Sequence, residues 1–134
     1  MMQLTLTTPA AVAANGPIIP ALDFNTNTNM LSYNAATGEI TFLQPGIYKI
    51  IANVMFSATS AGLNTIFGFS GSNAANVPAM QASFTTTAAE QAATYPIAKD
   101  VRINNAPGQF ARINLRSLTD GIVQNAVVIV EKVR

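Results

Sequence analysis

The chain has 134 residues and a formal net charge of +1, with 49% hydrophobic and only 10% charged residues. This length predicts one domain with a substantial core, and the high hydrophobicity excludes a disordered chain. The seven basic residues are scattered along the sequence rather than gathered into the stripe of a nucleic-acid-binding protein. Because soluble domains typically carry about 25% charged residues, we expect much of the surface to be covered by copies of the chain or by a larger assembly.

Cysteine and histidine are both absent, which removes disulfides, thiolate metal sites and the most common general base. The six carboxylates show no pairing that indicates hydrolytic chemistry. We therefore expect no enzyme, no cofactor and no metal site. Residues 1–17 lack the basic and apolar regions of a signal peptide, and no apolar run approaches the roughly 20 residues that cross a membrane. Neither a membrane nor a nucleic acid is an expected partner.

In chain order, alternating or β-branched stretches between turn formers predict short strands; they lie at residues 4–7, 18–24, 31–34, 39–42, 47–57, 63–69, 81–87, 95–103, 110–118 and 126–133. Pro96 is expected to interrupt its strand, and Pro20 to mark an edge or a bulge. Residues 88–93 are locally helical but too short to form a stable helix alone. The pattern predicts an all-β fold, an antiparallel β-sandwich of the jelly-roll kind with eight to ten short strands.

The stretch at residues 47–57 is apolar on both of its faces. One face and the later strands predict the core, which we assign to Tyr48, Ile50, Val54, Phe56, Ile113, Leu115, Val128 and Val130. The opposite face carries Ile47, Ile51 and Met55. A strand on the wall of a small domain usually buries one face only. This surplus face therefore predicts either an interface with other subunits or a cover formed by a loop or the N-terminal segment.

Three segments carry a resemblance to a known family: LSYNAATGEITFLQPGIYKIIANVMF at 31–56, PGQFARINLRSL at 107–118 and AVVIVEKV at 126–133. In this order they resemble the tumour necrosis factor-like jelly roll, which includes the globular heads of the complement collagen-like proteins. The resemblance implies a homotrimer around a threefold axis. It also implies that Ile47, Ile51 and Met55 meet the neighbouring subunits, while Tyr48, Val54 and their neighbours pack inside.

The segment before the last strand, residues 123–126, departs from the aromatic-Ser-Gly segment of many animal members. The Ala-, Thr- and Asn-rich style looks more like the bacteriophage and bacterial versions. This resemblance implies a virion structural protein made in the host cytoplasm, a capsid decoration or head-fibre trimer whose partner is the major capsid protein or another virion protein. The alternative is a receptor- or glycan-binding head of a phage fibre or of a bacterial spore-surface protein, located at the cell or spore surface.

Residues 1–21 leave two alternatives open before the jelly roll expected at 22–134. They form either the first strand of the sandwich or an extended docking arm with Leu4, Leu6 and Val12 as its apolar contacts. Residues 23–29, DFNTNTN, alternate oxygen-bearing side chains as calcium loops do. They lack the Gly and Glu of the helix-loop-helix motif, which favours a polar connecting loop. Displayed loops are expected at 57–64, 71–79 and 119–125.

Overall fold

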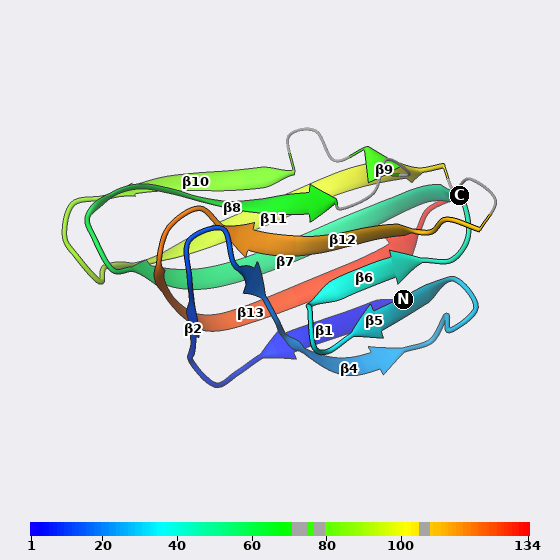
Figure 1. Ribbon diagram of the computed structural model, residues 1–134, viewed down its shortest axis with the longest axis horizontal. Helices are drawn as coiled ribbons and strands as arrows, with labels where there is room; N and C mark the ends of the chain where they lie inside the picture. Colours follow the sequence, from blue (N-terminus) through cyan, green and yellow to red (C-terminus); the bar gives the residue numbers. More distant parts are fainter. Residues whose placement is uncertain (71–74, 77–79, 105–107) are drawn as a thin grey trace.

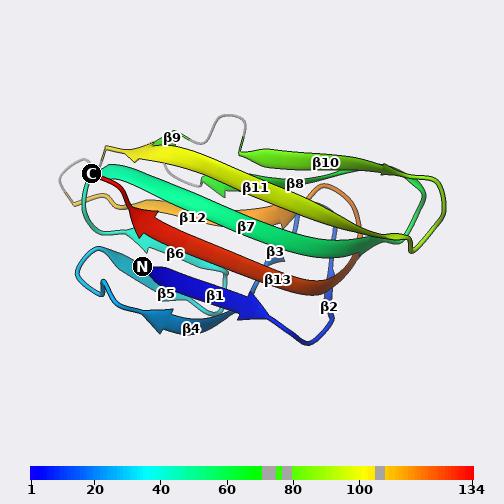
Figure 2. The ribbon, with the colours of Figure 1, turned by 180° about the vertical axis from the view of Figure 1, so that it is seen from behind.

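Two antiparallel sheets face each other in the computed structural model, which describes residues 1–70, 75–76, 80–104 and 108–134 (Figures 1 and 2). The first sheet follows the order β4 (Ala21–Asn25), β1 (Met2–Leu6), β13 (Gly121–Lys132), β7 (Gly46–Ala58), β11 (Ala92–Ile103) and β9 (Ala75–Asn76), with β2 (Ala10–Val12) also paired to β13. The second follows β10 (Gln81–Thr86), β8 (Gly62–Ser70), β12 (Ala111–Ser117), β6 (Glu39–Phe42) and β5 (Leu31–Asn34), with β3 (Pro17–Ile18) paired to β12. The all-β prediction is confirmed.

The core lies between the sheets because alternate side chains of each strand point inward, and most of these inward side chains are apolar. The eight side chains assigned to the core from the sequence are each at most 7% exposed. The Tyr48 ring packs edge-on against Phe42 with ring centroids 4.8 Å apart, and its hydroxyl donates to the Gln44 carbonyl at 2.8 Å. Tyr48 therefore anchors strand β7 in two ways: its ring packs in the core, and its hydroxyl binds the turn that precedes the strand.

The N-terminal segment is part of the sandwich, which corrects the docking-arm alternative. Strand β1 lies between β13 and β4, and Leu4 pairs with Val128 on one side and with Leu22 on the other. Leu4, Leu6 and Val12 are each at most 9% exposed, so their contacts are used within the chain. Because β1 and β4 are hydrogen-bonded neighbours, residue 21 is not a domain boundary.

Two local predictions differ from the structure. Residues 88–93, which are too short to form a stable helix alone, form a turn and the start of β11, with Glu90 in the left-handed region at φ 61°. Strand β11 continues through Pro96. In the described part of the chain, β9 pairs with β11 only at residues 102 and 103, so no pairing on that side involves Pro96. Strand β13 begins at Gly121, so the loop expected at 119–125 is mostly strand.

The other two predicted loops compare with the structure as follows. The loop between β7 and β8 covers residues 59–61 only, and the loop expected at 71–79 lies outside the described residues except for β9. The loops that join β7 to β8, β10 to β11 and β12 to β13 lie at one end of the sandwich, while both chain termini lie at the other end (Figure 1). The molecule therefore has a loop end and a terminal end.

Candidate functional site: the outer face of the first sheet

Strands β13, β7 and β11 lie side by side in the first sheet (Figure 2). Their outward side chains are uncharged from the row of Ile51 to the row of Met55. Strand register arranges these side chains in rows: Ile51 lies between Ile129 and Ala98, and Asn53 lies between Val127 and Pro96. We call this surface the apolar face and define it by Ile47, Ile51, Asn53, Met55, Pro96, Ala98, Val127 and Ile129. In a single chain Ile51 is 43% exposed and Val127 is 39% exposed.

The three residues expected at a subunit interface all lie on the apolar face. Ile51 is exposed, while Ile47 and Met55 are half-buried. The main chain of Ile47 is bonded to the last residues, with its N–H donating to the Arg134 carbonyl at 2.7 Å. The Met55 sulfur accepts from the Asn125 amide at 3.7 Å. The N-terminal segment does not cover this face, because β1 extends the sheet beside β13.

Charged side chains gather at one end of the apolar face. Lys49 lies between Glu131 on β13 and Asp100 on β11, and Arg102 lies opposite Ile47 in the next row. This end is the terminal end, because Lys132 pairs with Tyr48 near the start of β7. The rows from Ile51 to Met55 are uncharged, so the face has a clear polarity along the strands.

The sequence predicted the part of the apolar face that lies on β7. It did not predict the parts that lie on β13 and β11. Val127 and Ile129 were readable in principle, since residues 126–130 are apolar on both faces of a predicted strand. Pro96 and Ala98 carry no local signal, because only the pairing of β11 with β7 brings them to this surface.

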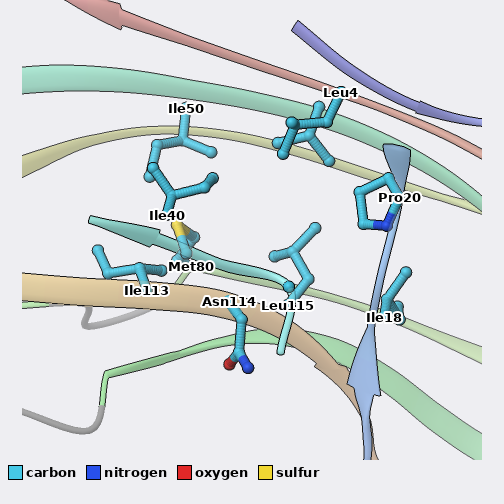
Figure 3. Close-up of a pocket in the computed structure, with 11 residues that line it drawn as sticks. Leu4, Ile18, Pro20, Ile40, Ile50, Met80, Ile113, Asn114 and Leu115 are labelled. Atoms are coloured by element: carbon cyan, nitrogen blue, oxygen red, sulfur yellow. The ribbon is translucent and has the colours of Figure 1, made fainter. Parts of the chain in front are cut away.

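A small cavity lies between the sheets, with a volume of about 10 Å³ (Figure 3). Side chains of Leu4, Ile40, Ile50 and Met80 line it, together with Asn114. Figure 3 shows the Asn114 amide directed away from the apolar side chains, and this amide donates to the Thr37 carbonyl at 3.3 Å. A cavity of this size holds at most one water molecule, so it is a packing defect and not a ligand site.

Several polar side chains of the sandwich are held in structural contacts, whereas the buried Asn64 amide nitrogen and Tyr95 hydroxyl have no hydrogen-bond partner among the described residues. Burial raises the pKa of Tyr33 to about 12, and its hydroxyl donates to the Pro20 carbonyl. Burial also raises the pKa of Tyr48. The Asp23 carboxylate of the calcium-loop-like segment accepts from Gln3 at 3.0 Å and from Thr5 at 2.8 Å. Within the described residues, no three His, Cys, Asp or Glu side chains gather as metal ligands do.

Comparison with solved structures confirms the fold. The chain is similar to the tumour necrosis factor Eiger from S. frugiperda, with a TM-score of 0.71 and 9% identity over 99% of this chain and 92% of that chain. It is also similar to murine APRIL, with a TM-score of 0.61 and 10% identity over 96% and 98% of the two chains. The vertex protein P5 of PRD1 matches with a TM-score of 0.49 and 15% identity over 95% and 93%.

The fold is therefore the tumour necrosis factor-like jelly roll. No protein-family model matches the chain, and no curated protein matches it in sequence. Among the described residues, no helix is long and apolar enough to span a membrane.

Proposed function

We propose that this protein is a non-enzymatic structural protein that acts as a homotrimer, a capsid decoration or head-fibre protein of a bacteriophage particle. The observation that carries the proposal is the apolar face. Fully burying an aliphatic side chain contributes about 1.5–3 kcal/mol, and Ile51, Val127 and Ile129 are contiguous on it. Obligate interfaces resemble a domain core cut in half, and the uncharged rows from Ile51 to Met55 suit such an interface.

A threefold ring needs two different patches on each subunit, because cyclic contacts beyond a dimer are heterologous. The apolar face supplies one patch. The open edge of the sandwich, where β10 runs beside β11, offers a second. There Phe84 is 43% exposed and its ring lies edge-on to Tyr95 with centroids 6.5 Å apart. We propose that the Phe84 edge of one subunit packs on the apolar face of the next.

The virion role rests on two further observations. The chain has few charged residues for a protein whose surface is free. Its composition, rich in Ala, Thr and Asn, resembles that of the bacteriophage and bacterial jelly rolls. A trimer of this kind would stabilise a shell by adding buried contacts where capsid subunits meet. Its loop end, opposite both termini, would face away from the shell or toward a host surface.

Electron cryomicroscopy of the source particle tests the virion role, with particles that lack this gene product as the matched control. The proposal predicts three-lobed density on the capsid surface that is missing from the control, and a lower temperature of capsid disruption for the control. Density confined to a fibre tip would overturn the decoration role in favour of a receptor-binding head. Complete absence of the protein from the particle would overturn both.

A further inference from the structure

The second sheet has its own outward surface, and one arginine on it is held in a fixed position. Arg116 of β12 stacks on Phe69 of β8, with its guanidinium carbon 3.9 Å from the ring centroid. Its Nε donates to the Asn114 amide oxygen at 3.3 Å, and its Nη1 donates to the Asn15 carbonyl at 3.2 Å. Three separate segments therefore orient this guanidinium, which reduces the entropy that a ligand contact would cost.

The supports of Arg116 are themselves anchored. Asn114 is 5% exposed, and its amide nitrogen is bound to the Thr37 carbonyl. Asn15 adopts the left-handed conformation at φ 60°, and its N–H donates to the Ser117 carbonyl at 2.7 Å. The turn around Asn15 is thus tied to the strand that carries Arg116. The Arg116 guanidinium is therefore held by contacts that are themselves fixed, unlike the side chain of a mobile surface arginine.

Arg116 retains donors for a ligand. A guanidinium carries five N–H groups, and among the described residues only Asn114 and Asn15 accept from it. Arg112 is exposed on the same face of β12, about 13 Å away along the strand at 3.3 Å per residue. Phe67 lies directly opposite Arg116 on one side and opposite Gln81 on the other. The surface combines two spaced cations with an aromatic ring and a side-chain amide.

We propose that this surface binds a polysaccharide that carries carboxylate groups. A guanidinium fork matches a carboxylate in two parallel hydrogen bonds, and two cations on one strand fit a chain with repeated negative groups. The Phe67 ring offers an apolar surface for the flat side of a sugar ring, and the Gln81 amide offers hydrogen bonds to hydroxyls. The inference stands apart from the trimer, because it uses the opposite face of the sandwich.

A nucleic acid fits the same surface less well. Phosphate backbones are bound by a continuous series of cations, whereas the described residues of this face provide two arginines, Arg112 and Arg116. A carboxylated polysaccharide is the occupant that the charges favour.

Titration calorimetry at low salt tests the proposal with polygalacturonate oligosaccharides as the probe. Neutral dextran and oligo(dT) serve as the comparison ligands. We expect polygalacturonate to bind, dextran to give no heat, and oligo(dT) to bind more weakly. Tighter binding of oligo(dT) would replace the proposal with a nucleic-acid surface. No binding of polygalacturonate at millimolar concentration, or equal binding of dextran, would overturn it.

Variants locate the site. Arg116→Gln should weaken polygalacturonate binding about tenfold or more, since a hydrogen-bonded charge pair contributes about 1.5–3 kcal/mol. Arg116→Lys should also weaken it, because the charge stays but the fork is lost. Arg112→Gln should weaken it by a smaller factor and keeps the test valid if Arg116→Gln fails to fold. Arg134→Gln, the same change at the terminal end, should leave the affinity unchanged. Equal affinity in all four variants would contradict the assignment.

Measuring the mass of the same samples separates this inference from the proposed function. A trimer that binds no polygalacturonate would overturn the polysaccharide site alone. A monomer that binds polygalacturonate would overturn the trimer alone.

Discussion

Ile51 lies directly opposite Ile129 on the outer face of the first sheet, while their chain neighbours Ile50 and Val130 lie opposite each other on the inner face. The inner pair is at most 1% exposed, and Ile51 is 43% exposed. One sheet therefore presents aliphatic pairs to both sides. The inner pair is explained by the core, and the outer pair is explained by the proposed trimer.

The first prediction concerns Ile51→Glu, which would place a carboxylate from each subunit in the proposed interface. A charge buried without a partner is costly, so we expect the trimer to dissociate while the far-ultraviolet circular dichroism of the sandwich is retained. Size-exclusion chromatography with light scattering measures the result. Leu63→Glu is the matched control, since Leu63 is 59% exposed on the second sheet and should leave the trimer intact. A trimer that survives Ile51→Glu means that the interface lies elsewhere.

The second prediction compares two glycines at which an added Cβ atom would collide with a neighbouring residue. A Cβ on Gly121 would meet the Ser57 carbonyl and the Phe56 ring, whereas one on Gly68 would meet the far end of the Met80 side chain. A backbone carbonyl cannot move aside, but a methionine side chain can. We expect Gly121→Ala to cost about 1–3 kcal/mol of unfolding free energy and Gly68→Ala to cost less. Urea denaturation of both variants checks the order, and the reverse order would contradict the packing described here.

The third prediction concerns Asn64, which is fully buried and ties β8 to the loop between β12 and β13. Its side-chain oxygen accepts from the Thr119 N–H at 3.1 Å and from the Thr119 hydroxyl at 2.7 Å. Asn64→Ala leaves these donors without their acceptor, so we expect a loss of about 1–3 kcal/mol of unfolding free energy. A double-mutant cycle with Thr119→Val should show a coupling of about 0.5 kcal/mol or more. Strict additivity of the two changes would argue against this contact.

The fourth prediction follows from Tyr33. Burial raises its pKa in the folded chain to about 12, above the value of about 10 in an unfolded chain. The folded state therefore holds the phenol proton more tightly, and this contribution to stability is complete below pH 10. It is lost as the pH rises from 10 toward 12.

Tyrosinate absorbance and denaturation at alkaline pH check this expectation. The native protein should show a tyrosine that ionises near pH 12, and Tyr33→Phe should remove that step. The unfolding free energy of Tyr33→Phe should be lower at neutral pH, because the hydrogen bond to Pro20 is lost, and should fall less between pH 10 and 12. Complete ionisation of all tyrosines near pH 10 in the folded protein would contradict the burial of Tyr33.

Local alternation made most of the fold predictable. Residues 39–42 alternate so regularly that both the strand and its inner face follow from the sequence. Residues 46–58 predict a strand as well, although their sequence is apolar on both faces and alternates only in burial. What alternation does not contain is the identity of the neighbouring strand. Leu4 and Leu6 alternate equally well in a strand of the sandwich and in an arm added to a partner, so only the observed pairing with β13 separates the two.

The features that sequence reasoning missed depend on contacts between distant segments. Pro96 reads as a strand breaker, but it lies in a strand that, among the described residues, is paired at this position on the β7 side only, and edge strands accept proline. The stack of Arg116 on Phe69 requires the register between β12 and β8, which no local pattern encodes. The apolar face was found only along β7, because its other columns come from strands far away in sequence.

The mass of the purified protein in solution at low micromolar concentration tests the central claim most directly. Sedimentation equilibrium should give about 42 kDa, three times the 14.1 kDa of one chain, with no change on dilution across that range. A stable species of 14.1 kDa would leave the apolar face exposed to water and would contradict the account of this protein as an obligate trimer.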